Sequence, residues 1–291
     1  MPHTNFHSVA VIIPVYNAFK ETRACIESVL SKTRAPYRLL LIDDGSSDSR
    51  IWPLINSYAK AHPNVQVHRN ISNQGFTATT NRGCVLAASA DVVLLNSDTC
   101  VTDKWLEKLT ACACLHELVA TVTPLSNAAG VFSVPFRNRV NKLPDGWAPD
   151  EFSRLIENLS PRTRPEVPVG NGFCMYVTRK ALKRIGGFDT ARFPAGYGAE
   201  NDFCMRAGRL GFVHLIEDST FIYHKRSASF RFGKYAALYR GEKQLNRLHP
   251  DYRRVVREWL AADPLEGFRW RLQRFLAEGA VPRGKESGCL R

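Results

Sequence analysis

The sequence contains no long hydrophobic run. Its 291 residues are 44% hydrophobic, yet no apolar stretch approaches the roughly 20 residues that a membrane-spanning helix needs. The N-terminus also lacks the basic segment and apolar core of a secretory signal. Because the hydrophobic fraction is ample for a packed core, disorder of the whole chain is excluded. We expect a folded, cytoplasmic protein.

Paired cysteines, internal repeats and low-complexity tracts are also absent. None of the eight cysteines forms a Cys-x-x-Cys pair, and no histidine spacing completes a zinc site. Cys112 and Cys114 lie two positions apart, which directs them to different sides of a helix. We therefore expect reduced, mostly buried thiols. The eight are Cys25, Cys84, Cys100, Cys112, Cys114, Cys174, Cys204 and Cys289.

Acidic residues are scarce relative to basic ones. The chain holds 40 Lys and Arg against 27 Asp and Glu, a net charge of +13. From Arg179 onward there are 23 Lys and Arg and 12 Asp and Glu, so this part carries +11 of that charge. A basic C-terminal third indicates an anionic partner, which could be a phosphate-rich substrate, nucleic acid or an acidic membrane surface. No recognisable nucleic-acid-binding motif accompanies the charge.

Short apolar strands alternate with helices over the first 125 residues. Asn17 is expected to cap the first helix, and Thr102 or Asp103 the fourth. Five strands separated by four helices predict βαβ units, and hence an α/β, Rossmann-like, mixed but mainly parallel sheet with helices on both faces. The expected strands are 9–13, 39–42, 65–68, 91–95 and 119–122, and the later helices 51–61, 77–88 and 104–116.

The alternation stops at Ser126. Residues 126–168 are rich in Asn, Pro and Arg, with one candidate helix at 150–158, which is typical of a binding loop in a compact domain. Regular structure is expected to return over the remainder of the chain, which ends in a basic helical extension. The expected elements are strands 173–177, 212–216 and 220–224, helices 179–185 and 200–210, and further helices within 230–277.

Polar clusters follow four of the strands. In a parallel sheet all these strand ends lie along one edge, where open α/β sheets bind ligands. Acidic side chains there can accept hydrogen bonds from a base and ribose, and Asp98 can hold a divalent cation against phosphates. The alternative for any single cluster is an Asx-turn or a helix cap. The clusters are residues 14–17, 43–46, 73–75 and 96–98.

These clusters, with two later segments, resemble the inverting family 2 glycosyltransferases, which have the GT-A fold. The resemblance covers roughly residues 8–230, and the order and spacing of six segments make it specific at the family level. It does not identify the sugar. The matching segments are residues 11–17, 41–48, 73–83, 95–98, 186–189 and 200–206.

The resemblance implies a nucleotide-sugar pocket. Asp43 would accept a hydrogen bond from the imide of uracil or thymine, so a UDP- or dTDP-sugar is expected. Asp44 would turn its loop or contact the ribose. Gly75 permits close backbone approach to the diphosphate. The implied nucleotide-sugar residues are Pro14, Tyr16, Asn17, Asp43, Asp44, Asn73, Gly75, Arg82, Asn96 and Ser97.

The family's Asp-x-Asp metal motif corresponds here to Asn96-Ser97-Asp98. Because the first position is Asn, the site has one negative charge fewer and Asp98 must carry most of the metal binding. The resemblance adds His224, at the end of a late strand, as a second ligand; the alternative is an ordinary hydrogen-bonded histidine. Mn²⁺ or Mg²⁺ suits oxygen ligands and a bound diphosphate, and imidazole suits Mn²⁺ better.

The resemblance places the catalytic base at Glu200, with Asp202 as the later carboxylate that supports the site. The alternative is that both only compensate the N-terminal charge of a helix. Residues that shape the acceptor site are expected at Trp147, Asn171 and Gly172, although Trp147 could instead only anchor its loop.

The implied reaction is an inverting glycosyl transfer from a nucleoside-diphosphate sugar to a saccharide or lipid-linked saccharide, in surface polysaccharide or lipopolysaccharide biosynthesis. The resemblance then divides the chain into a nucleotide-sugar-binding half (1–125), an acceptor-binding and catalytic half of the same domain (126–229) and the basic extension (230–291). Two alternatives remain: a sugar nucleotidyltransferase, although the usual Gly-rich loop after the first strand is missing, and a catalytically degenerate binder.

The C-terminal extension contains a candidate amphipathic helix. Asp263-Pro264 would supply its cap and first turn. An apolar stripe then runs beside three arginines, so the helix could lie on an anionic membrane at the inner face of the plasma membrane or pack on the catalytic body. The sequence does not determine the oligomeric state. The stripe is Leu265, Phe268, Leu272, Phe275 and Leu276, and the arginines are Arg269, Arg271 and Arg274.

Overall fold

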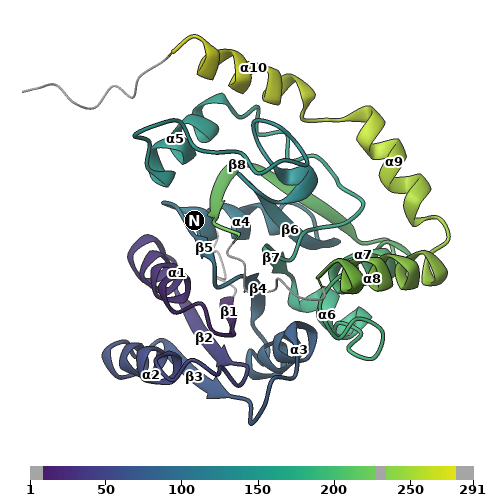
Figure 1. The fold of residues 1–291 in the computed structure, drawn as a ribbon. Helices are drawn as coiled ribbons and strands as arrows, with labels where there is room; N and C mark the ends of the chain where they lie inside the picture. The colour runs from purple at the N-terminus through teal and green to yellow at the C-terminus, as the bar shows by residue number, and fades with distance from the viewer. Residues whose placement is uncertain (1–8, 227–233, 280–291) are drawn as a thin grey trace, which may run out of the picture.

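The computed structural model describes residues 9–226 and 234–279. Its eight strands form one sheet in the order β3-β2-β1-β4-β7-β6-β8-β5 (Figure 1). The strands are β1 (Val9–Val15), β2 (Tyr37–Asp43), β3 (Val65–Arg69), β4 (Asp91–Leu95), β5 (Thr99–Cys100), β6 (Val119–Ser126), β7 (Cys174–Val177) and β8 (Val213–His224).

Helices cover both faces of this sheet, as the alternating pattern predicts. The short 3₁₀ helix η1 (Gly130–Phe132) lies in the long insertion after β6. The α-helices are α1 (Phe19–Lys32), α2 (Ile51–Ala61), α3 (Phe76–Leu86), α4 (Trp105–Ala113), α5 (Pro149–Leu159), α6 (Arg179–Ile185), α7 (Ala199–Gly208), α8 (Lys234–Leu248), α9 (Tyr252–Ala262) and α10 (Glu266–Ala277).

Successive side chains of each strand point to opposite faces of the sheet, and a hydrophobic core lies on each face. In β1, Val11 and Ile13 face one side and Ala10 and Ile12 the other, as the period of two requires. The first core also contains residues of α1, α2, α4, α5 and α10, and the second contains residues of α3, α6, α7 and α8. All four β1 residues are completely buried, which explains why this strand reads as a continuous apolar run.

The sheet is mixed rather than wholly parallel. β1 pairs in parallel with β2 and β4, β2 with β3, and β6 with β8. β7 runs antiparallel to both β4 and β6, and β5 antiparallel to β8. The two late strands expected at 212–216 and 220–224 are one strand, β8, whose register shifts opposite Pro124 and Leu125.

The caps predicted for the first and fourth helices are wrong. Ala18 occupies the position before α1, and the Asn17 side chain instead accepts a hydrogen bond from the Asp48 amide (2.9 Å). Lys104 precedes α4, and the Thr102 hydroxyl donates to the Phe221 carbonyl of β8 (2.6 Å). In both cases the side chain that was expected to cap the helix forms a hydrogen bond with a residue far away in the sequence instead.

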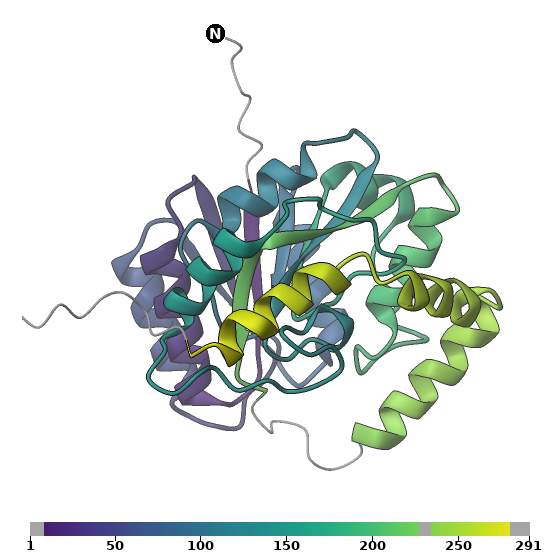
Figure 2. The same cartoon turned by 90° about the horizontal axis from the view of Figure 1, so that it is seen from above.

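The C-terminal helices form an arm along the body (Figure 2). Leu265, Phe268 and Leu272 are buried in the first core, so the apolar stripe of α10 packs on the protein. The predicted Asp263-Pro264 start is wrong because α10 begins at Glu266, and the Asp263 carboxylate instead pairs with Arg269. Residues 227–233 and 280–291, including Cys289, lie outside the described residues.

The described cysteines are unpaired, as predicted. Five are buried, Cys100 is half-buried and Cys114 is exposed. Cys112 is buried while Cys114 faces solvent, which agrees with their expected placement on different sides of one helix. Within the described ranges, no helix has both the length and the apolar character needed to cross a bilayer.

Candidate active site

The predicted site residues gather at one edge of the sheet because of strand direction. β2 ends at Asp43, β4 ends three residues before Asp98, and β8 ends at His224. These strands run the same way, so their carboxyl ends share an edge. β7 runs in the opposite direction, which brings Gly172, two residues before its first residue, to that same edge next to the end of β4. Sequence periodicity alone does not reveal this reversal.

Asp43 is fully buried at the end of β2. Its Oδ1 accepts a hydrogen bond from the Ser46 amide (2.8 Å), and its Oδ2 forms an ion pair with Arg69 Nε (3.0 Å). The guanidinium of Arg69 also lies over the Trp52 ring, 5.4 Å from its centroid. Oδ2 has no well-aligned hydrogen-bond donor among the described residues. A directed donor, such as the imide of a pyrimidine, is chemically suited to that oxygen.

Arg69 was not among the predicted site residues. The register of the parallel β2–β3 pair sets it directly beside Asp43. A sequence signal existed, because both are the last residues of adjacent parallel strands. Finding it required knowing that β2 and β3 are neighbours.

Asp44 holds the loop that follows β3. Its Oδ1 accepts from the Gln74 amide (2.9 Å) and from Asn70 Nδ2 (2.7 Å), and its Oδ2 accepts from the Gly75 amide (3.0 Å). These bonds show that Asp44 fixes its loop, and a contact between Asp44 and a ribose stays a prediction. Arg82 supports the same loop, since it donates to the Arg69 carbonyl (2.8 Å) and to Asn70 Oδ1.

The loop 73–75 lies close to the segment that precedes α7. Asn73 Oδ1 accepts from the Gly75 amide (3.0 Å). Gly75 has φ +86°, and a Cβ there would meet the Pro194 carbonyl oxygen at 2.6 Å. Glycine is therefore required both for the backbone conformation and for the approach of the two loops. The role of this loop at a diphosphate stays a prediction.

Asp98 and His224 face one another. His224 Nε2 lies 3.2 Å from Asp98 Oδ1, and His224 Nδ1 lies 2.9 Å from the Ala128 carbonyl oxygen. Because a carbonyl can only accept, Nδ1 carries a proton and donates, which leaves Nε2 directed at the carboxylate. The ring also stacks on Phe173, with centroids 5.5 Å apart. A histidine oriented in this way through a backbone carbonyl is the usual arrangement of a metal ligand.

This pair fits a divalent cation. A neutral imidazole nitrogen and a carboxylate oxygen are both acceptors, so their approach needs a proton or a cation between them. Among the described residues no group of three His, Cys, Asp or Glu side chains could hold a metal. Two protein ligands agree with the Asn at position 96, and Mg²⁺-type sites complete their coordination with substrate phosphates and water.

The remaining residues of the loop 96–98 and the residues at the end of β1 lie at the same edge. The Asn96 amide donates to the Phe173 carbonyl (2.9 Å), and its carbonyl accepts from Thr99 Oγ1 (2.7 Å). These backbone bonds fix the loop and leave the Asn96 side chain half-buried. Half-buried residues also precede α1 and Asp98: Pro14, Tyr16, Asn17 and Ser97.

Glu200 lies in the first turn of α7 and lines a small pocket. Removal from water by the pocket walls raises the pKa of the Glu200 carboxyl to about 7. A Cβ added to Gly172 would lie 3.7 Å from Glu200 Oε1, so the glycine borders the carboxylate directly. The pocket is lined by Phe76, Thr77, Thr80, Leu94, Gly172, Phe188, Ala199 and Glu200.

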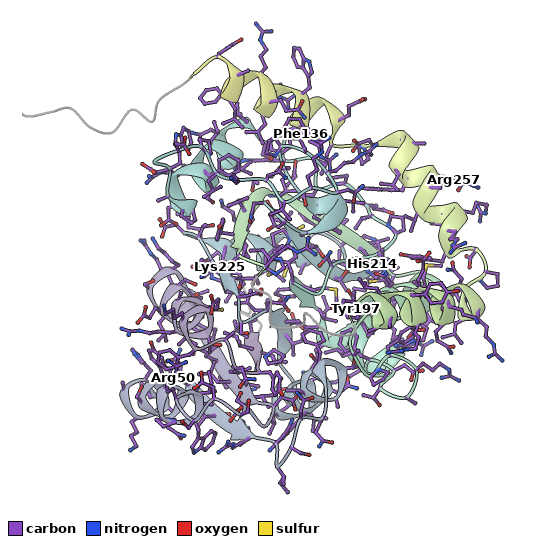
Figure 3. All side chains as sticks on the ribbon, in the orientation of Figure 1. Arg50, Phe136, Tyr197, His214, Lys225 and Arg257 are labelled. Atoms are coloured by element: carbon purple, nitrogen blue, oxygen red, sulfur yellow. The ribbon has the colours of Figure 1, made fainter. Side chains whose placement is uncertain are left out.

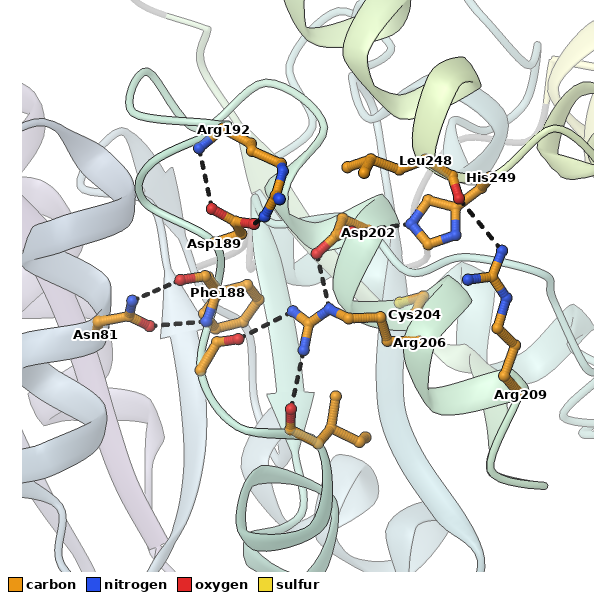
Figure 4. Close-up of polar contacts among 12 residues, drawn as sticks. Asn81, Phe188, Asp189, Arg192, Asp202, Cys204, Arg206, Arg209, Leu248 and His249 are labelled. Atoms are coloured by element: carbon orange, nitrogen blue, oxygen red, sulfur yellow. Dashed lines mark hydrogen bonds and ion pairs between the residues drawn. The ribbon is translucent and has the colours of Figure 1, made fainter.

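Asp202 contacts Arg206 and His249, as Figure 4 shows. Its Oδ2 accepts from Arg206 Nε (2.8 Å), and its Oδ1 contacts His249 Nε2 (2.8 Å) at the end of α8. Asp202 is only 3% exposed. Both carboxylate oxygens of Asp202 are therefore occupied by partners within the protein.

A hydrogen-bond network secures the segment between α6 and α7 (Figure 4). Asn81 of α3 donates to the Phe188 carbonyl (2.7 Å) and accepts from the Phe188 amide (2.9 Å). Arg206 donates to the carbonyls of Ile185 (3.0 Å) and Gly187 (2.9 Å). Asn81 and Arg206 fall inside matched sequence segments, but local reasoning assigned them no function.

The predicted acceptor residues are dispersed. Asn171 Oδ1 accepts from the Phe173 amide (3.1 Å), so its side chain shapes the turn before β7 next to Gly172. Trp147 packs edge-on against Phe152 with centroids 6.4 Å apart, and Phe152 packs on Phe221 of β8. Trp147 thus anchors its loop, and its role toward an acceptor stays a prediction.

The mixed sheet with its flanking helices defines a protein of the GT-A fold class. GalNAc-T7, solved with UDP, GalNAc and Mn²⁺, superimposes with a TM-score of 0.64 at 16% identity over 94% of this chain and 56% of that one. The mannosyltransferase PcManGT from Pyrobaculum calidifontis, solved with GDP-Man and Mn²⁺, gives 0.58 at 16% identity over 94% and 76%. At this identity the likeness establishes the fold, as predicted.

The sequence profile described as Glycosyl transferase family 2 matches residues 10–186, more than half of the chain. The protein therefore belongs to glycosyltransferase family 2. A curated relative, the uncharacterized glycosyltransferase YibD of Escherichia coli (strain K12), is 32% identical over 92 residues. That match spans 32% of this chain and 26% of the relative.

Proposed function

We propose that the protein transfers a glycosyl group, with inversion, from a nucleoside-diphosphate sugar to a hydroxyl of a saccharide or lipid-linked saccharide. A uridine or thymidine diphosphate donor fits Asp43 best, because its Oδ2 can accept from a pyrimidine imide. Surface polysaccharide or lipopolysaccharide assembly is the proposed setting.

The observation that carries this proposal is the position of Glu200. It lines a pocket together with Leu94 of β4, four residues before Asp98, and with Gly172 at the amino end of β7. A carboxyl whose pKa is about 7 can accept a proton near neutral pH. A base beside a nucleotide edge is the arrangement that displacement at an anomeric carbon requires.

The chain's own residues would act in sequence. Asp43 and Arg69 would hold the base of the donor, and the loop fixed by Asp44 would lie along its diphosphate. Glu200 would remove the proton of the acceptor hydroxyl as that oxygen attacks the anomeric carbon. The bond to the diphosphate breaks in the same displacement, which inverts the configuration.

A divalent cation is proposed at Asp98 and His224, whose acceptor atoms lie 3.2 Å apart. When bound, Mn²⁺ or Mg²⁺ would stabilise the negative charge of the departing diphosphate.

A calorimetric titration tests the donor site. Nucleoside diphosphates and their sugars are titrated into the protein with and without Mn²⁺. We expect binding of UDP or dTDP ligands that strengthens with Mn²⁺, and loss of the Mn²⁺-dependent part in Asp98→Ala. Asp103→Ala is the matched control, because that carboxylate is about half-exposed and pairs with Lys32. Equal Mn²⁺ dependence in both variants would remove Asp98 from the metal site.

Product analysis separates the alternatives. Incubation with a donor and an acceptor panel should release nucleoside diphosphate and form a glycoside of inverted configuration, read by NMR. Release of pyrophosphate would indicate a sugar nucleotidyltransferase instead. Tight donor binding without turnover across the panel would favour a degenerate binder.

A further inference from the structure

The turn between α8 and α9 contacts the first turn of α7, which carries Glu200. Asn201 Nδ2 donates to Tyr252 Oη (3.0 Å), and His249 Nε2 donates to Asp202 Oδ1 (2.8 Å). The two residues that follow Glu200 are therefore both bound by residues of the C-terminal extension. Figure 4 shows the contact between His249 and Asp202.

The segment before α7 is also in direct contact with α8. Gly196 and Gly198 have φ +91° and +93°, a backbone region that glycine adopts freely. A Cβ placed on Gly241 of α8 would meet the Tyr197 carbonyl oxygen at 2.2 Å. In Figure 3, Tyr197 lies beside α8, whereas Arg257 projects from the outer side of α9. Because the segment that precedes α7 contains these two glycines, it does not fix the position of α7 by itself. That position depends on contacts with other elements, such as α8.

The contact between His249 and Asp202 is buried, so its loss would be costly in free energy. His249 is 2% exposed and Asp202 3%. Without the imidazole, a buried carboxylate would keep only the Arg206 ion pair, and an unsatisfied buried acceptor is costly. Tyr252 lies close enough to Glu200 that burial, and after it the charge of Glu200, raises the pKa of the tyrosine to about 12.

We propose that the α8–α9 turn, with the first residue of α9, positions the catalytic base. His249 binds Asp202 and Tyr252 binds Asn201, and these two contacts fix the position of the Glu200 carboxylate. The C-terminal extension is then a part of the active site and not an appendage. The inference rests on the proposed function in one respect, which is the role of Glu200 as the base. A displacement of about 1 Å in a catalytic group can cost about a hundredfold in rate.

Hydrogen exchange tests the positioning without using activity. The full-length protein is compared with His249→Leu, His249→Gln and Tyr252→Phe, and peptides within residues 193–206 are followed by mass spectrometry. We expect faster exchange at the start of α7 in His249→Leu and Tyr252→Phe, and recovery toward the wild type in His249→Gln, because the glutamine amide can donate where Nε2 does. Tyr239→Phe is the matched control, since Tyr239 is 68% exposed on α8.

Steady-state kinetics test the consequence for the base. We expect kcat to fall about tenfold to a hundredfold in His249→Leu, with a smaller fall in Tyr252→Phe, while the donor KM stays within about twofold. A fall in donor affinity that equals the fall in kcat would indicate general misfolding and overturn the proposal. Unchanged exchange in both variants would also overturn it.

The two experiments separate this inference from the proposed function. If the wild type transfers no sugar, the proposed function fails, and the exchange of residues 193–206 still decides whether the turn holds α7. If the wild type is active and His249→Leu and Tyr252→Phe are as active as Tyr239→Phe, only the positioning role fails.

Discussion

Glu200 and Asp202 lie two positions apart on one helix turn, yet their surroundings give them opposite properties. Glu200 is desolvated by a pocket with mainly apolar walls, and its pKa rises to about 7. Asp202 is compensated by Arg206 and His249, each at 2.8 Å. Burial raises the pKa of the Glu200 carboxyl because it disfavours the charged form, whereas the Asp202 carboxylate is held by an ion pair and a hydrogen bond. The chemistry of each carboxyl is therefore set by its neighbours.

Replacing Glu200 by glutamine should remove the base without changing the size of the side chain. We expect Glu200→Gln to bind donor normally and to lose at least about a hundredfold in kcat, the lower range for general acid–base catalysis. Asp202→Asn should lose less kcat, because its role is to hold α7. Comparable losses in the two variants would mean that Glu200 is not the base.

The pH dependence of the wild type follows from the same carboxyl. A base must be ionised, so kcat/KM should fall as the pH drops below about 7, the pKa of Glu200. Donor binding, measured by calorimetry over the same range, serves as the control for loss of metal or nucleotide affinity. A flat kcat/KM profile between pH 5.5 and 7.5, on the order of two pH units, would contradict this assignment.

Glu200 should also lower stability at high pH. Its pKa is raised in the folded state, from 4.5 to about 7, so the folded protein binds more protons than the unfolded chain between these values. Its contribution to stability is present at low pH and is lost as the pH rises through about 7. The unfolding free energy of Glu200→Gln should therefore exceed that of the wild type above pH 7. The difference between the two proteins should be smaller at pH 4.5, as measured by urea titration.

At the scale of the element, α3 is held against the sheet by close backbone packing. Gly83 lies over β1, where an added Cβ would meet Ile12 Cγ2 at 2.5 Å and Ile42 Cδ1 at 3.1 Å. Both isoleucines are fully buried. A methyl group there forces the helix or the strands to move. The glycine in this matched segment is therefore explained by packing as well as by any approach to a phosphate.

Gly83→Ala should destabilise the protein by about 1–3 kcal/mol, the usual cost of overpacking a core. Gly208→Ala is the matched control, because Gly208 ends α7 and an added Cβ would meet nothing within 4 Å. There the gain in helix propensity should stabilise by about 0.5–1 kcal/mol. Urea unfolding midpoints measure both, and similar shifts in the two variants would show that α3 is not tightly seated.

At the scale of the whole molecule, the C-terminal arm is anchored into the first core. Phe268 and Leu272 of α10 are buried among residues from α5 and the sheet. Arg269, only 4% exposed, donates to Asp263 and to the Val131 carbonyl (2.6 Å). The arm therefore unfolds with the body and contributes to its stability.

Phe268→Ala should lower the unfolding free energy by about 3–5 kcal/mol, the range for truncation of a buried phenylalanine. Trp270→Ala is the control on the same helix, because Trp270 is 58% exposed. It should change stability by no more than about 1 kcal/mol, its exposed cation–π contact with Arg274 included. A small effect of Phe268→Ala would show that α10 detaches at little cost.

The sequence by itself determined the elements and the family. Buried parallel strands read as apolar runs, and α2 and α6 begin and end where the pattern placed them. The resemblance of six ordered segments predicted a family 2 glycosyltransferase of the GT-A fold, which the family profile and the solved structures confirm. Local patterns could do this because burial and helix periodicity are properties of short segments.

Tertiary structure alone decided which residues meet. The reversed direction of β7 brings Gly172 to Glu200, the β2–β3 register sets Arg69 beside Asp43, and the α8–α9 turn brings His249 to Asp202. The caps expected of Asn17 and Asp263 failed for the same reason, since their side chains contact partners far away in the sequence, the Asp48 amide and Arg137. Contacts between residues far apart in sequence depend on the path of the whole chain, and no short segment contains that information.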